Sequence, residues 1–214
     1  LLQLVNSNKN RKNSLITINK VTSIGLLLSA LFSFFLLIYA HIISDFTLVN
    51  VFENSHTTKP LIYKVSGVWG NHEGSMLLWI LVLTIFNYFI FRLYNKSNSI
   101  FISKTLETQA LITFGFLLFT FLTSNPFEKM KILKADGLGF NPILQDPALA
   151  IHPPLLYIGY VGFSAAFSFS IATLSLQNIE EKKFWYTYMK PFVVAAWTFL
   201  TIGIAFGSIW AYYE

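Results

Sequence analysis

The sequence predicts an all-α, polytopic membrane protein with about five transmembrane helices and a short interfacial element before the fourth. Composition is the first observation, because 54% of the 214 residues are hydrophobic, 12% are charged and the mean hydropathy is +0.57. A soluble domain would carry about a quarter charged residues. The second observation is a set of five long stretches without Asp, Glu, Lys or Arg, each able to cross a bilayer as a helix. Cysteine is absent, which excludes disulfides, thiolate metal sites and a cysteine nucleophile within the chain.

The predicted elements follow these charge-free stretches in order. Residues 1–20 form a polar, basic inner-face tail, and residues 21–214 form the transmembrane region. We expect helices at about residues 21–43, 74–91, 106–125, 153–176 and 191–212. The fourth stretch, 147–179, is longer than one crossing needs. Its first part is therefore assigned to the interface, and the helix is expected to start near Pro153 or Pro154, since proline suits a first helical turn.

The distribution of basic residues predicts which end of each helix lies inside. Ten of the fifteen Lys and Arg side chains fall in the tail and in the second and fourth connections: Lys9, Arg11, Lys12, Lys20, Arg92, Lys96, Lys104, Lys182, Lys183 and Lys190. These segments should face the inner side, so the net charge of +5 reports orientation and not nucleic-acid binding. The N-terminus is then inside and Glu214 outside. His41, His56, His72 and His152 all fall at or near the outer face.

The first segment that attracts attention is the run from Val68 to Trp79. Asn71 or His72 could cap the second transmembrane helix, and Glu73 suits the positive end of that helix. This purely structural role does not explain why Gly70 and Gly74 bracket a polar triplet, an arrangement that lets the backbone approach another backbone or a flat ligand closely.

The second segment runs from residue 137 to residue 162 and contains turn signals at Asn141-Pro142 and Asp146-Pro147. We interpret it as a re-entrant or interfacial element that leads to His152 just before two prolines. A neutral imidazole with one free nitrogen is a suitable axial ligand for haem iron, and its other nitrogen needs a partner such as Gln145 or Asp146. The alternative is a histidine that caps the helix or anchors at the lipid headgroups.

Together the two segments resemble the N-terminal half of the CcmF family, the haem lyase subunit of System I cytochrome c maturation. The similarity runs from about Asn19 through Tyr63-Lys64-Val65-Ser66 to the last residues, 206–214. In that family a Trp-rich outer-face segment, the WWD domain, follows the residues that match 210–214. The resemblance implies that His152 is the first of two outer-face axial ligands of haem, and that both ligands of a second, intramembrane haem lie beyond this chain.

The resemblance also implies the activity, a holocytochrome c synthase (cytochrome c haem lyase) of which this chain is one fragment. The enzyme would hold haem b on the outer face for thioether attachment to the Cys-x-x-Cys-His motif of apocytochrome c. Trp69, Phe140 and Tyr157 are candidates for packing on the haem face, and Lys59 and Lys64 for its propionates, although abundant aromatics are more often core or lipid-facing and loop lysines are usually solvated. No residue is assigned a catalytic role.

The implied partners are the remaining maturase fragments, which carry the WWD segment and the other haem-ligand histidines, together with other System I proteins and the lipid bilayer. A split maturase suggests the mitochondrial inner membrane, with the N-terminus on the matrix side and the C-terminus on the intermembrane-space side; a bacterial plasma membrane is the other possibility. The rival hypothesis is a structural subunit that has lost catalysis. A transporter is disfavoured because the five charge-free stretches carry no ionisable Asp, Glu, Lys or Arg.

Overall fold

The computed structural model describes residues 2–94, 99–132, 134–139, 141, 145–176 and 185–213. These residues form the helices α1 (Leu2–Ile43), α2 (Val49–Asn54), α3 (Leu61–Ser66), α4 (His72–Tyr94), α5 (Ser99–Thr123), α6 (Pro147–Ser175) and α8 (Trp185–Tyr213). No strand occurs in the described ranges, where Leu48 and Lys129 form an isolated antiparallel bridge. The all-α prediction is confirmed.

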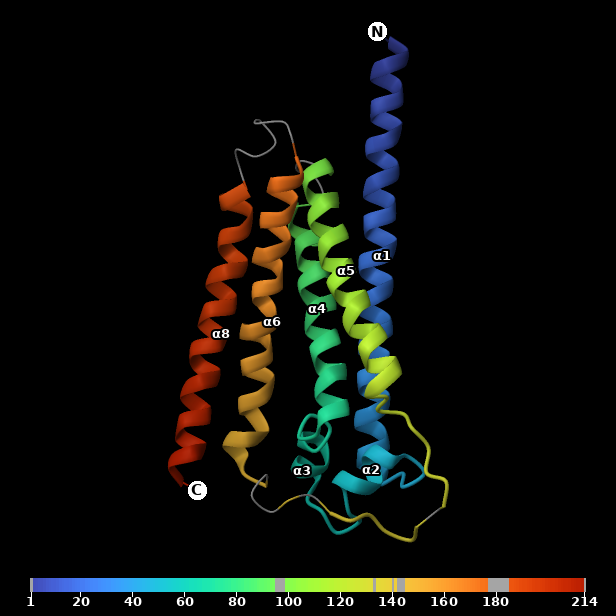
Figure 1. Cartoon of the computed structure of the whole chain (residues 1–214), viewed down its shortest axis with the longest axis vertical. Helices are drawn as coiled ribbons and strands as arrows, with labels where there is room; N and C mark the ends of the chain where they lie inside the picture. Colours follow the sequence, from blue (N-terminus) through green and yellow to red (C-terminus); the bar gives the residue numbers. More distant parts are fainter. Residues whose placement is uncertain are drawn as a thin grey trace.

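Five of the helices are long and apolar enough to cross a membrane, which confirms the predicted number of spans. The candidate spans are Ser14–Ile43, His72–Tyr94, Ile100–Thr123, Ala150–Ser175 and Trp185–Tyr212. Figure 1 shows them side by side, with the two ends of the chain at opposite ends of the bundle. Because consecutive long helices run in opposite directions, every second connection lies at the same end.

Helix α4 is the centre of the bundle and α8 is at its edge. The most apolar window of α4 is 61% buried, whereas that of α8 is 17% buried. Helix α4 contacts α1, α5 and α6, while α8 packs mainly against α6. The fold therefore consists of a core around α4 with the α6–α8 pair on one flank (Figure 1).

Neutral polar side chains connect the long helices inside the bundle. Gln109 of α5 donates to the Oγ of Ser164 at 2.9 Å and accepts from the Oγ of Ser168 at 2.8 Å, both on α6. Ser23 of α1 donates to the Oδ1 of Asn87 of α4 at 2.7 Å. Hydrogen bonds of this kind hold helices together where lipid offers no competing partner.

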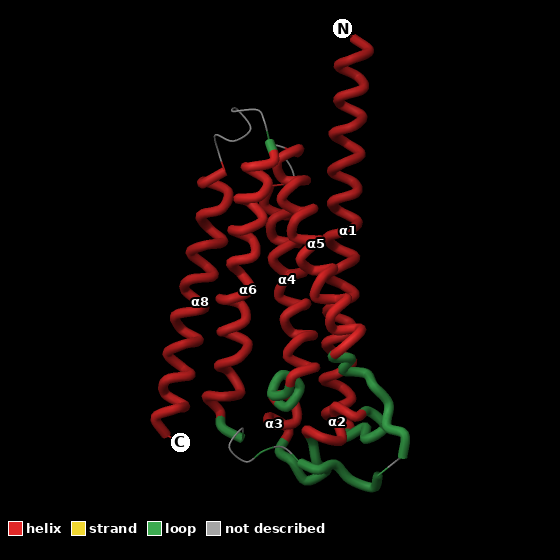
Figure 2. Tube along the Cα trace, viewed as in Figure 1, coloured by secondary structure: helices red, strands yellow, loops and turns green. Residues whose placement is uncertain are grey.

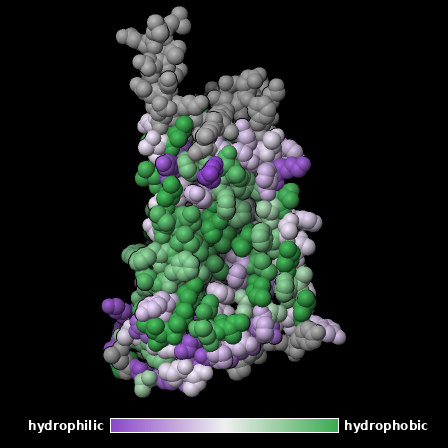
Figure 3. Space-filling view, turned by 180° about the vertical axis from the view of Figure 1, so that it is seen from behind, coloured by the Kyte–Doolittle hydropathy of each residue, from purple (hydrophilic) through white to green (hydrophobic). Residues whose placement is uncertain are grey.

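The outer surface of the bundle carries a broad apolar band. Phe32, Phe114, Phe121, Leu174 and Trp197 are each at least 60% exposed. In Figure 3 hydrophobic residues cover the middle of the molecule, and hydrophilic residues collect above and below them. A surface of this type is stable against lipid tails, which supports the membrane assignment.

Several helices extend beyond the stretches expected from the sequence. Helix α1 is continuous from Leu2, and α5 begins at Ser99 and not near residue 106. Lys104 and Glu107 fit into α5 as an exposed i, i+3 ion pair at 2.8 Å. A charge-free stretch marks the apolar part of a helix, and exposed ion pairs let the helix continue past it.

Helix α6 begins at Pro147, before the expected start at Pro153 or Pro154. Asp146 Oδ1 accepts from the amide of Ala148 at 2.7 Å, and the carbonyl of Asp146 accepts from Ala150 at 3.0 Å. Pro147 therefore occupies the first helical position. Pro153 and Pro154 lie inside the helix, so the expectation that one of them marks the first helical turn is wrong. Within the predicted interfacial element, Phe140 and residues 142–144 lie outside the described residues.

At one end of the bundle, the α1–α4 connection, which contains α2 and α3, and the described residues of the α5–α6 connection form a folded region, here called the loop cap (Figure 2). The α5–α6 connection is joined to the α2 region by backbone hydrogen bonds, from Val49 to the carbonyl of Glu128 and from Leu138 to the carbonyl of Phe52. His41 ends α1, His72 begins α4, His56 follows α2 and His152 lies near the start of α6. The four histidines therefore share this end of the bundle.

Candidate functional site

The turn between α3 and α4 places Trp69 against the rest of the site. Asn71 caps α4, since its Oδ1 accepts from the amide of Gly74 at 2.8 Å. A Cβ on Gly74 would collide with the carbonyl of Val68, so glycine is required for this close approach of two backbone segments. Ser75 Oγ then donates to the carbonyl of Trp69 at 2.8 Å and fixes the turn.

The first turns of α6 carry the second part of the site. Pro154 has no N–H to donate to the carbonyl four residues earlier, that of Ala150. The indole Nε1 of Trp69 donates to this carbonyl at 3.0 Å. The two segments that the sequence marked as unusual are therefore joined directly, through a side-chain hydrogen bond that takes the place of a helical one.

His152 of α6 packs its ring against α8. Its Nδ1 lies 2.7 Å from the carbonyl oxygen of Gly203. A carbonyl can only accept, so Nδ1 carries the proton and Nε2 of the neutral ring carries a lone pair. The ring lies against Gly207, where a Cβ would be 2.6 Å from Cε1. The expected partners Gln145 and Asp146 are thus wrong, and a backbone carbonyl of α8 has this role.

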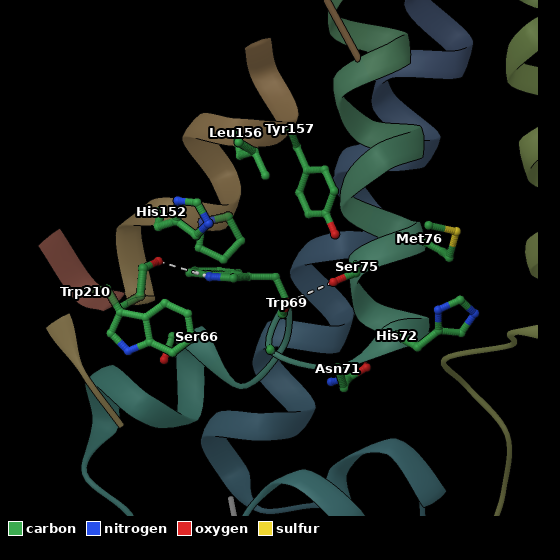
Figure 4. Close-up of a pocket in the computed structure, with 13 residues that line it drawn as sticks. Ser66, Trp69, Asn71, His72, Ser75, Met76, His152, Leu156, Tyr157 and Trp210 are labelled. Carbon is green, nitrogen blue, oxygen red and sulfur yellow. Dashed lines mark hydrogen bonds between the residues drawn. The ribbon is translucent and has the colours of Figure 1, made fainter. Parts of the chain in front are cut away.

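Trp69, Ala150 and His152 line a pocket of about 430 Å³, a volume within the usual range of ligand sites. In Figure 4 His152 and Trp210 lie on one side of α4 with Trp69, and His72 and Met76 lie on the other. The lining comes from α3, the turn before α4, α4, α6 and α8: Ser66, Trp69, Gly70, Asn71, His72, Ser75, Met76, Ala150, His152, Pro153, Leu156, Tyr157 and Trp210.

Three of the sequence-predicted residues meet at this pocket, namely His152, Trp69 and Tyr157. Trp69 also stacks on Phe34 of α1, with ring centroids 6.3 Å apart and an interplanar angle of 18°. Tyr157 packs edge-on against Trp79 at 5.6 Å. Phe140 lies outside the described residues.

Neither predicted propionate partner lines the pocket. Lys59 is 8% exposed and its Nζ donates to the carbonyl of Asn54 at 2.9 Å. Lys64 Nζ donates to the Oγ of Ser44 at 2.7 Å. Burial and, secondarily, the nearby charge of Lys64 lower the pKa of Lys59 to about 8.

The sequence interpretation did not select Trp210 as a site residue. Gly203, Gly207 and Trp210 are spaced by four and three residues, so they share one face of α8. The sequence shows this spacing, but it does not show that this face of α8 packs against α6. The Nε1 of Trp210 is buried without a hydrogen-bond partner among the described residues.

The other histidines have different environments. His41 is fully buried, with its Nε2 3.0 Å from Asn50 Oδ1. His56 pairs with Asp136 at 3.2 Å in the loop cap. The hydrogen bond from the Thr57 hydroxyl, with weaker contributions from the amides of Thr57 and Gly137 and from His56, outweighs the effect of burial and lowers the pKa of Asp136. His72 Nε2 lies 2.9 Å from Ser124 Oγ. His152 differs from all three because its hydrogen-bonded nitrogen faces a backbone carbonyl.

An imidazole at this pocket could bind the iron of a haem as an axial ligand. No group of three His, Cys, Asp or Glu is placed to hold a metal ion within the described part of the chain. A porphyrin supplies the equatorial ligands of its iron, so the imidazole of His152 could add one axial ligand beside the indole and phenol rings of the pocket.

Comparison with known proteins identifies relatives of the chain. A family model described as cytochrome c assembly protein matches residues 69–214. The biogenesis protein CycK of Rhizobium meliloti (strain 1021) is 51% identical over 183 residues, which cover 86% of this chain and 27% of CycK. The biogenesis protein CcmF of Escherichia coli (strain K12) is 42% identical over 190 residues, covering 88% of this chain and 29% of that protein.

A solved structure has the same fold. The cytochrome c haem lyase CcmF superposes with a TM-score of 0.73 at 26% sequence identity, over 89% of this chain and 29% of that chain. The chain therefore spans less than a third of the length of these relatives.

Proposed function

Because the chain belongs to the cytochrome c assembly protein family, we propose that it forms part of a cytochrome c haem lyase. On this proposal it positions haem on the outer face of the membrane for thioether attachment to apocytochrome c. Its relatives CycK and CcmF are named for cytochrome c-type biogenesis, and the solved structure with this fold is named a haem lyase.

The observation that carries the proposal is the hydrogen bond between His152 and Gly203. It fixes the proton on Nδ1 and leaves Nε2 able to bind iron. The indole and phenol rings of Trp69, Trp210 and Tyr157 supply the flat apolar surfaces that a porphyrin packs against.

The chemistry then divides between the chain and its substrates. Bound haem supplies the vinyl groups that receive the thiols of apocytochrome c. These thiols belong to the Cys-x-x-Cys-His motif of apocytochrome c, and the chain itself contains no cysteine. The residues around the pocket orient the macrocycle and keep His152 in one tautomer, which accelerates the reaction through placement.

The proposal includes partner chains. The relatives are more than three times as long as the part matched here, and we infer that further maturase segments supply the Trp-rich WWD segment and the second axial histidine. Other maturation proteins and apocytochrome c complete the assembly. We place it in the mitochondrial inner membrane, with the histidine end of the bundle toward the intermembrane space.

The test is the haem absorption spectrum of the native membrane complex with a His152→Ala substitution. We expect the bands of the outer-face haem to shift or disappear, because Nε2 of His152 would be one of its two axial ligands. His56→Ala is the matched control, since His56 lies in the loop cap outside the pocket. An unchanged spectrum in His152→Ala would remove the assigned role and favour a structural subunit.

A further inference from the structure

Trp69 and Pro154 meet at one backbone carbonyl. A helical carbonyl normally accepts from the amide four residues later, but Pro154 leaves that of Ala150 without this donor. Trp69 Nε1 donates to it at 3.0 Å. We propose that Trp69 is a positioning residue, whose indole N–H replaces the missing amide and fixes the helical turn that carries His152.

Trp69 is itself held from several directions. Its ring stacks on Phe34 of α1, and its own carbonyl accepts from Ser75 Oγ of α4. The indole N–H therefore connects α6 to a turn that is already attached to two other helices. Because the indole of Trp69 is fixed, its hydrogen bond restrains the position of the Ala150 carbonyl. A mobile donor on the surface would follow the carbonyl and would not restrain it.

The restrained turn has a second attachment through His152. His152 lies two residues after Ala150, and its Nδ1 reaches the carbonyl of Gly203 on α8. The turn is thus held on one side by Trp69 and on the other by Gly203. Releasing the Trp69 side lets the turn move and changes where Nε2 points. The importance of that direction for haem rests on the proposed function.

A second tryptophan, Trp79, provides a control that distinguishes the effect of the hydrogen bond from the effect of ring packing. Trp79 stacks on Phe116 with centroids 5.0 Å apart, but its Nε1 is buried without a partner among the described residues. Trp79→Phe therefore removes a similar ring volume and an indole N–H that donates to nothing described. It is the matched control for Trp69→Phe, which removes the donor to Ala150.

The experiment compares Trp69→Phe, Trp79→Phe, Pro154→Ala and the Trp69→Phe/Pro154→Ala double variant in the native maturase complex. The readouts are amide hydrogen exchange of residues 151–158, with and without haem, and haem occupancy from the absorption spectrum. In Trp69→Phe we expect exchange to rise and occupancy to fall about fivefold, the effect of one lost hydrogen bond. Pro154→Ala supplies a backbone amide to Ala150 and should restore both values in the double variant.

Rescue by Pro154→Ala, with Trp79→Phe close to wild type, supports the assignment. The assignment is overturned if Trp69→Phe matches Trp79→Phe, or if the double variant is no better than Trp69→Phe alone. If Trp69→Phe does not fold, the double variant must fold for the assignment to stand. Failure of the proposed function is seen separately, as an unchanged spectrum in His152→Ala, while the exchange measurement without haem still reports on the Trp69 bond.

Discussion

The fold buries the charged side chain of Lys59, which is unfavourable for an ammonium group. It is 8% exposed, and burial together with the charge of Lys64 lowers its pKa from 10.5 to about 8. Between about pH 8 and 10.5 the unfolded chain binds more protons than the folded one, so stability rises with pH across this window. Below pH 8 both states are protonated, and the full cost of burying the ammonium remains.

We therefore predict that Lys59→Met stabilises the chain at neutral pH by at most about 3 kcal/mol and removes most of the rise in stability above pH 8. Thermal unfolding in detergent at about pH 7.5 and pH 9.5 measures both effects. Lys129→Met is the control, because Lys129 is exposed in the loop cap. Equal pH dependence in Lys59→Met and the parent chain would contradict this account.

At the scale of single residues, three candidates chosen from the sequence lie at one pocket. His152, Trp69 and Tyr157 stood out because of their neighbours in the chain, and the structure brings them to one pocket. The carbonyl of Gly203 could not be found in the same way, because any helical carbonyl can accept a hydrogen bond and only the packing of α8 on α6 selects this one. The environment of Lys59 also depends on packing.

The α6–α8 pair is held by close backbone contact. Gly159 of α6 lies against the backbone of Leu200, and Gly203 of α8 lies against Leu156, where a Cβ would be 2.8 Å from its amide nitrogen. Gly203 and Gly207 have the small-xxx-small spacing that allows membrane helices to approach closely. This approach brings the Gly203 carbonyl within reach of His152.

We predict that Gly159→Ala destabilises the bundle by about 1–3 kcal/mol, because the added methyl group collides with the Leu200 backbone and separates α6 from α8. Thermal unfolding in detergent measures the loss. Gly115→Ala on α5 is the control, since its Cβ would meet nothing within 4 Å. A Gly159→Ala chain as stable as the Gly115→Ala chain would exclude the predicted collision.

Helix boundaries were harder to predict than helix number. The five spans follow from hydropathy alone, because every backbone group in lipid must be satisfied within a helix. The start of α6 was predicted too late because a side chain far away in the sequence, Trp69, compensates for a proline inside the helix. The short helices α2 and α3 lie in the loop cap, where hydropathy gives no signal.

Among the described residues, three candidate spans, Ser14–Ile43, His72–Tyr94 and Ile100–Thr123, separate Ser14 from the α5–α6 connection, so these two positions should face different compartments. The chain has no cysteine, which allows single-cysteine labelling without background. We predict that Ser14→Cys, at the start of the first candidate span, and Lys131→Cys, in the α5–α6 connection, react with a membrane-impermeant maleimide from opposite sides. On the proposed location in the mitochondrial inner membrane, Lys131→Cys should react when only the outer membrane is opened, and Ser14→Cys only after the inner membrane is permeabilised.

Labelling of both positions from the same side would contradict the bundle topology. Labelling from opposite sides, but with Ser14→Cys reacting first, would keep the topology and reverse the proposed orientation. Both residues are exposed, so slow reaction would not be caused by burial.

On the proposed function, the carbonyl of Gly203 would influence the redox potential of the haem that His152 binds. A carboxylate at this place would draw the Nδ1 proton strongly and give the imidazole partial imidazolate character, whereas a peptide oxygen withdraws it only weakly. If His152 binds haem iron as proposed, a ring with this partner would donate less electron density to the iron, which would raise the midpoint potential. The packing of two glycine-lined helices would then favour ferrous iron without placing a charge in the membrane.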